Sequence, residues 1–188
     1  MDAAVTVRLR DERGTTIVEV VIASAILVTL MAGLMSLAGL ALSTTENQGH
    51  LGARTTEYSQ DKMEQLLALT YGDSTSDTRL FPAANSGGSG LAVGGSSDTS
   101  APVALYVDYL DQRGNLCGST GAECAAPVGT TPPANWFYQR VWRIDDRSSD
   151  GTLPTDLKRI TVTATIARGF GGAMKASSTL TVLKARGF

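Results

Sequence analysis

The apolar positions of this chain are concentrated in one early segment. From Val20 to Thr45 the sequence contains no Asp, Glu, Lys or Arg. As an α-helix these 26 residues would span about 39 Å, more than the roughly 30 Å hydrocarbon core of a bilayer. The pattern therefore predicts one membrane-spanning helix near the N-terminus.

The flank before this apolar run fixes its expected orientation. It carries Arg8, Arg10 and Arg13 beside three acids, and positive charge next to the first apolar run favours a cytoplasmic flank. The run is longer than the roughly 7–15 apolar residues of a secretory signal. We therefore expect a retained anchor, with the remainder of the chain outside the cytoplasm.

Beyond Thr45 the helix is expected to continue with a thinner apolar stripe, through Tyr58, Met63 and Leu66, and to stop at Tyr71–Asp73. The following stretch to Ser100 is rich in Gly, Ser and Thr and predicts a surface loop. Its glycine spacing matches neither dinucleotide-binding nor phosphate-binding loops, and no Lys-Ser or Lys-Thr pair follows.

The last part of the chain predicts antiparallel β-structure. Leu157–Ala167 alternates most clearly, because Ile160, Val162, Ala164 and Ile166 share one face and three threonines share the other. A sheet with one apolar face needs a cover, and the amphipathic helix around Met63–Leu69 is the long element available. The sequence therefore predicts an α+β protein whose strands are Ala104–Leu110, Trp136–Ile144, Leu157–Ala167 and Lys175–Leu183.

Composition and charge narrow the possible functions. Sixteen Lys and Arg against eighteen Asp and Glu give a net charge of −2, which argues against a nucleic-acid binder with a broad basic surface. One His and two Cys leave little for a zinc cluster or a His-based catalytic centre. No nucleophile and base pair can be named, so we expect neither an enzyme nor a cofactor.

Two groups of residues in the last part are candidate sites. Cys117 and Cys124 predict a structural disulfide, because an exported domain lies in an oxidising compartment. Asp145, Asp146 and Asp150 are weak candidates for a Ca²⁺ site, with a solvated turn as the favoured alternative since Arg147 lies among them.

A dense aromatic group lies at the expected second strand. We expect these side chains to belong to the core beneath the strand or, alternatively, to anchor an interface with a partner. The group consists of Trp136, Phe137, Tyr138 and Trp142.

Glu19 is the most informative single residue. A carboxylate at the start of an otherwise uncharged membrane segment costs roughly 2.5–3.5 kcal/mol on insertion scales, so it needs a partner. In one alternative, Glu19 lies near the membrane–water interface, where water and the positive N-terminal end of the helix dipole stabilise its charge. Another is a cation supplied by a neighbouring helix.

The segment Arg13-Gly-Thr-Thr-Ile-Val-Glu-Val-Val-Ile-Ala23 resembles the N-terminal signature of the type IV pilin-like family. The resemblance implies that prepilin peptidase cuts after Gly14 and methylates the new amino group of Thr15. It also implies that Glu19, the fifth mature residue, pairs with the Thr15 amine of a neighbouring subunit. Thr15 stands where the family usually has Phe, and Ser36 where major subunits often have Pro; minor pilins and pseudopilins vary more at these positions.

The resemblance implies a type IV pilin-like fold and an assembly function. We expect a minor pilin that is held in the inner membrane and then assembles into, or primes, a pilus filament through contacts with other pilins. The alternatives are a minor pseudopilin of a type II secretion system and a signal-anchored periplasmic binding module. The expected divisions begin with a leader (residues 1–14), a membrane or filament-core helix (15–45) and its amphipathic continuation (46–71). A Gly/Ser-rich loop (72–103) and a β-sheet head (104–188) follow.

Overall fold

The structure is a computed structural model that describes residues 16–80, 82–167 and 175–187. The chain divides into two compact units, Met1–Thr45 and Glu46–Phe188. The described residues form one helix and five strands, which are α1 (Ile17–Ala68), β1 (Gly94–Gly95), β2 (Val107–Leu110), β3 (Tyr138–Asp145), β4 (Leu157–Ile166) and β5 (Ser177–Ala185).

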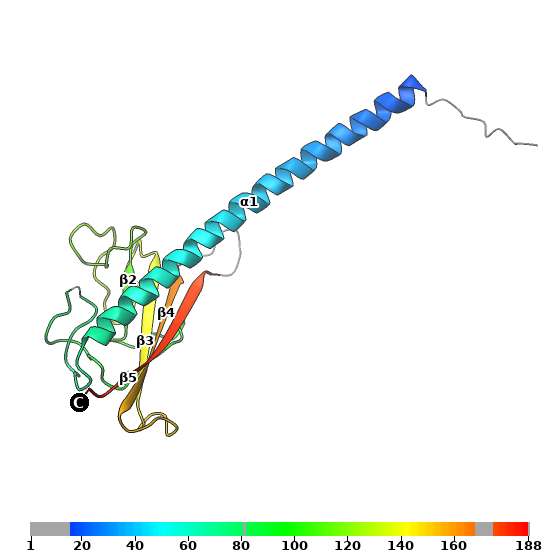
Figure 1. The fold of residues 1–188 in the computed structure, drawn as a ribbon. Coiled ribbons are helices and arrows are strands. Elements are labelled where there is room, and N and C mark those ends of the chain that lie inside the picture. Colours follow the sequence, from blue (N-terminus) through cyan, green and yellow to red (C-terminus); the bar gives the residue numbers. More distant parts are fainter. Residues whose placement is uncertain (1–15, 81, 168–174, 188) are drawn as a thin grey trace, which may run out of the picture. The chain divides into compact units, whose positions relative to one another are not determined.

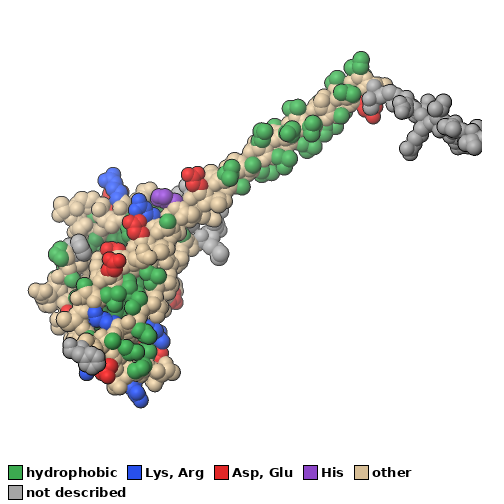
Figure 2. Space-filling view, in the orientation of Figure 1, with side chains coloured by type: hydrophobic (Ala, Val, Ile, Leu, Met, Phe, Trp, Pro, Cys, Tyr) green, Lys and Arg blue, Asp and Glu red, His purple; other side chains and the backbone are tan. Residues whose placement is uncertain are grey.

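The described part of the first unit is the N-terminal part of α1. Thr16 precedes the helix, and its Oγ1 accepts a hydrogen bond from the Glu19 backbone N–H at 3.4 Å, as an N-cap residue does. All side chains from Thr16 to Thr45 are exposed in the single chain, and Figure 2 shows apolar side chains along the visible side of this segment. The helix is long and apolar enough to cross a membrane.

In the second unit, α1 ends at Ala68, three residues before the predicted end. The last turn tightens, because the Leu69 N–H donates to the Leu66 carbonyl at 3.3 Å. The helix has no basic residue in its last turn. Instead Lys184 of β5 donates from Nζ to the Leu67 carbonyl at 2.5 Å, so a distant lysine caps the negative end of the helix.

The strands form one antiparallel sheet in the order β1-β3-β4-β5, with β2 also paired to β3 (Figure 1). The four predicted strands are present, with ends shifted by up to three residues, and the α+β layout is confirmed. The sequence did not predict β1, since Gly94 and Gly95 lie in the expected loop and carry no side chain that could show an alternating pattern.

One face of the sheet packs against the second half of α1, as predicted. Met63 and Leu66 of the helix join Trp142 of β3 and Ile160 and Val162 of β4 in one buried cluster. A second cluster nearer the start of this helix segment contains Leu51, Tyr58, Leu110, Tyr138, Ala164 and Ile166.

The opposite face of the sheet is covered at β2 and β3, which the sequence did not predict. Val107 and Tyr109 of β2 and Val141 of β3 form a buried cluster with Cys117 and Cys124. The segment between β2 and β3 thus supplies a second apolar layer, and the disulfide belongs to it.

Candidate functional site

The predicted cleavage site, Gly14 and Thr15, lies outside the described residues. Glu19 lies in the first turn of α1 and is exposed. The positive end of the helix dipole favours a carboxylate there. No described residue forms an ion pair with Glu19, so within the described part of the chain only the helix terminus offsets its charge.

The apolar side chains of the first unit form a continuous exposed surface around α1. Ile17, Met35 and Leu42 expose 84, 72 and 72% of their surface, respectively. A monomeric protein in water rarely exposes so large an apolar area. Such a surface is consistent with a single membrane-spanning segment.

The predicted disulfide between Cys117 and Cys124 is present, with the two Cα atoms 4.8 Å apart. Both cysteines are buried. A backbone hydrogen bond joins the same two segments, since the Gly118 N–H donates to the Cys124 carbonyl at 2.9 Å. The bridge is a structural element of the covered sheet face.

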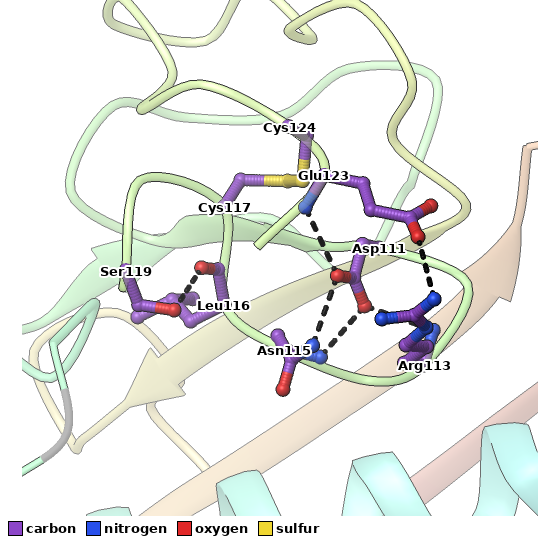
Figure 3. Close-up of a disulfide and its surroundings, with 8 residues drawn as sticks. All are labelled: Asp111, Arg113, Asn115, Leu116, Cys117, Ser119, Glu123 and Cys124. Atoms are coloured by element: carbon purple, nitrogen blue, oxygen red, sulfur yellow. Dashed lines mark hydrogen bonds and ion pairs between the residues drawn. A yellow bond between two sulfur atoms is a disulfide. The ribbon is translucent and has the colours of Figure 1, made fainter. Parts of the chain in front are cut away.

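Asp111 holds the loop that contains this disulfide (Figure 3). Its carboxylate accepts hydrogen bonds from the backbone N–H groups of Arg113 at 2.8 Å, Asn115 at 2.8 Å and Glu123 at 3.1 Å. Burial would raise the pKa of Asp111, but the Asn115 side-chain amide, which donates to it at 3.0 Å, and these backbone bonds hold it below its ordinary value. A single carboxylate therefore fixes both ends of the loop.

The acidic group proposed as a weak Ca²⁺ candidate is an ion-paired turn. Arg159 lies between Asp145 and Asp150, at 3.1 and 2.8 Å from their carboxylate oxygens. Asp145 also pairs with Arg143 at 2.9 Å, and Asp146 accepts hydrogen bonds from Ser148. Within the described ranges, no three His, Cys, Asp or Glu side chains are grouped to hold a metal ion. Cations of the protein thus pair with two of the three candidate carboxylates.

A buried ion network that sequence reasoning missed joins α1 to the sheet. Asp108 of β2 accepts from Arg140 of β3 at 2.7 and 2.9 Å and from Lys62 of α1 at 2.7 Å. All three side chains are nearly inaccessible, with 2% or less of Lys62 and Asp108 and 4% of Arg140 exposed. Asp61, which is half exposed, binds Arg140 at 2.8 Å. Two cations thus meet two anions.

The environment of Lys62 is unusual for a lysine. Its ammonium lies 4.1 Å from the centre of the Trp142 ring and also donates to the Thr78 carbonyl. Desolvation lowers its pKa to about 8, although the Asp108 carboxylate opposes this. Burial would raise the pKa of Asp108, but Arg140 and Lys62 hold it below its ordinary value.

The network borders a groove of about 580 Å³ between α1 and the disulfide loop. Arg140, Asp61 and Gln65 line one side, and Asn115 and Leu116 line the other. The Arg140 guanidinium is already occupied by two carboxylates, so it is not available as a catalytic or anion-binding group. This geometry supports a structural role for the network.

All four members of the aromatic group contribute to the core clusters of the sheet. Tyr138 and Trp142 are buried strand core, whereas Trp136 and Phe137 are only half-buried.

Compared with known protein families, curated proteins and solved structures, this chain shows no match.

Proposed function

We propose that this chain is a structural minor pilin of a type IV pilus, with a type IV pilin-like fold. The single observation that carries the proposal is the position of Glu19. It is the only charged residue of the first turn of a helix whose next 26 residues carry no charge, and Gly14 precedes it by five positions.

Assembly would follow from the chemistry of that helix end. Cleavage after Gly14 by prepilin peptidase creates an α-ammonium at Thr15, which the same enzyme methylates. In a bundle of such helices, the Glu19 carboxylate of one subunit pairs with the Thr15 ammonium of the next and neutralises both charges in a medium of low dielectric constant. The exposed apolar surface of α1 is buried by lipid before assembly and by neighbouring pilins afterwards.

The disulfide supports an extracytoplasmic location of the second unit, since disulfides persist in oxidising compartments. The head would lie outside the inner membrane, and after assembly on the pilus at the cell surface. A pseudopilin of a type II secretion system would share all of these features and differ in the machine that it joins.

The test is the mass and N-terminal sequence of the protein isolated from membranes. We expect Thr15 as the first residue, carrying one methyl group. Gly14→Ala should leave the unprocessed precursor, whereas Gly33→Ala, at a helix position with open space around it, should be processed normally. A membrane protein that retains Met1 would instead be a signal-anchored module.

Deletion of the gene distinguishes a pilus subunit from a subunit of a secretion pseudopilus. Loss of surface filaments in sheared fractions supports the pilus, and loss of protein secretion with filaments intact supports the pseudopilus.

A further inference from the structure

A second pocket in the unit of residues 46–188 has no role in the proposed assembly. It encloses about 600 Å³, which lies in the range of small-ligand sites. Its lining combines two aromatic residues, three planar polar residues and small apolar ones, and its larger members are Trp136, Phe137, Gln112, Glu123, Asn135 and Pro133.

Trp136 gives the pocket an accessible aromatic surface. The indole is half-buried, whereas Trp142, the second tryptophan of the chain, is fully buried. Tyr109 contacts Trp136 in a T-shaped arrangement, with ring centres 5.4 Å apart. The indole also packs against the same buried cluster that contains Val107 and Val141, and its exposed remainder lines the pocket.

The polar groups of the pocket keep unused hydrogen-bonding capacity. Gln112 and Asn135 are exposed, and within the described ranges neither side-chain amide takes part in a hydrogen bond. Arg113 occupies one carboxylate oxygen of Glu123 at 3.3 Å, which leaves the other oxygen as an acceptor. Two amides and a carboxylate oxygen supply both donors and acceptors beside the ring.

Hydrogen bonds hold parts of the backbone that carries this lining. Asp111 binds the Glu123 N–H, and the Phe137 N–H donates to the Leu110 carbonyl at 2.8 Å. The Phe137 carbonyl in turn accepts from the Ala167 N–H at 2.7 Å. Asn135 has φ +62°, in the left-handed region that costs energy for a residue with a side chain. These contacts fix the backbone around Glu123 and Phe137, at two sides of the lining.

We propose that this pocket binds a neutral pyranose ring of a glycan. The C–H face of the sugar stacks on Trp136, while the amides of Gln112 and Asn135 and the free oxygen of Glu123 bind adjacent hydroxyl groups. Arg113 neutralises Glu123, so the pocket offers no unpaired charge to an acidic sugar or a cationic ligand. A proline-rich peptide fits less well, because it uses a series of aromatic ridges and leaves planar polar groups without partners.

The inference does not rest on the proposed role of α1, since every lining residue lies in the second unit. The full chain is reconstituted in lipid nanodiscs, because maltoside or glucoside detergents would themselves present sugar rings. The probes are maltotriose, chitotriose and N-acetyllactosamine as neutral sugars, 3′-sialyllactose as an acidic sugar, and decaproline as the peptide. Binding is measured by titration calorimetry and by protection of tryptophan fluorescence from acrylamide.

We expect at least one neutral sugar to bind and to protect Trp136 from quenching. Trp136→Ala should abolish this binding, but it also removes the contact with Tyr109. Gln112→Ala and Asn135→Gly are therefore the decisive variants, because each removes an exposed amide, and Gly accepts the positive φ at position 135. Each should weaken binding about tenfold, the loss of one well-placed hydrogen bond.

The matched control is Val128→Ala, at an exposed residue outside the pocket lining. It should leave the affinity unchanged, and retention of the Cys117–Cys124 disulfide checks the fold of every variant. The proposal is overturned if no neutral sugar binds, if decaproline alone binds, or if Gln112→Ala and Asn135→Gly both bind as tightly as the natural chain.

Discussion

The Lys62 ammonium of α1 lies 2.7 Å from a carboxylate oxygen of Asp108 in β2, and neither side chain is accessible to water. Arg140 binds the same carboxylate through two nitrogens. The pairing therefore connects the helix to two neighbouring strands at the centre of their contact. Removing these charges from water costs several kcal/mol for each ion, and the ion pairs offset part of that cost.

Asp108→Asn is expected to destabilise the second unit severely. It leaves Lys62 and Arg140 buried with only the half-exposed Asp61 as a counter-charge. Loss of one partner from a buried ion pair typically lowers the free energy of unfolding by about 3–5 kcal/mol. Urea unfolding of the full chain in detergent micelles, followed by tryptophan fluorescence, measures this change.

Asp61→Asn is the matched control, because its carboxylate is 53% exposed. We expect a loss of about 1 kcal/mol or less, as for exposed ion pairs. Equal losses in the two variants would contradict the conclusion that Asp108 is the centre of the network.

The pKa of Lys62 predicts an unusual dependence of stability on pH. It is about 8 in the folded protein, against 10.5 for an unperturbed lysine. Between these values the unfolded chain binds more protons than the folded one, so the free energy of unfolding rises with pH. From pH 8 to 9.5 the gain is at most about 2 kcal/mol.

Lys62→Met isolates this effect. The variant should show a flatter rise between pH 8 and 9.5 in the same urea experiment, since Lys158 and Lys184, whose pKa values are also lowered by burial, remain. Burial raises the pKa of Tyr58, Tyr109 and Tyr138, so these groups contribute a falling slope only near and above pH 10. An identical rise in both proteins would mean that Lys62 does not titrate in this window.

The elements that the sequence predicts are those with a regular pattern of apolar residues. The alternation in β4 places Ile160, Val162 and Ile166 on one face, and all three are buried as the pattern indicates. The apolar run of α1 is predictable for the same reason. By contrast, the contact of Lys184 with the Leu67 carbonyl joins residues 117 positions apart, and no local pattern encodes it.

The buried network left a weaker signal in the sequence. Asp108 interrupts the apolar expected strand Ala104–Leu110, and Arg140 interrupts the next one, Trp136–Ile144. The first expected strand carries one acid and the second carries two bases, Arg140 and Arg143. Opposite charges in neighbouring strands indicate a pairing, and Asp108 and Arg140 are direct partners in the register of β2 and β3. Lys62 carried no such signal, because its helix segment contains other charged residues that are exposed.

Reduction of the disulfide should loosen the covered face of the sheet. The bond closes a loop of seven positions, for which chain entropy predicts a loss of about 2–3 kcal/mol when Cys117 and Cys124 are both changed to Ser. Asp111 continues to hold the loop through the N–H groups of Asn115 and Glu123. The double variant should therefore fold and retain Tyr109 in its buried position.

The additional change Asp111→Ala in the double Cys→Ser variant tests that explanation. With both restraints removed, the loss of stability should exceed the sum of the separate losses by a measurable amount, about 1 kcal/mol, because the two restraints act on one loop. Strictly additive losses would show that the two restraints act independently.

Glu19→Val is the sharpest test of the assembly proposal. Val removes a carboxylate that is unfavourable in the membrane, by roughly 2.5–3.5 kcal/mol at the centre of a helix and less near its end, so insertion should be at least as efficient as for the natural chain. Incorporation into filaments should fall by an order of magnitude or more, because the Thr15 ammonium of the neighbouring subunit then lacks its partner. Immunoblots compare the protein in membrane and sheared-filament fractions.

Glu46→Gln is the matched control, since this exposed acid lies on the same helix beyond the uncharged run, and it should leave both fractions unchanged. Normal recovery of Glu19→Val in filaments would show that the carboxylate is only satisfied by water and the helix terminus, and that assembly depends on apolar packing alone.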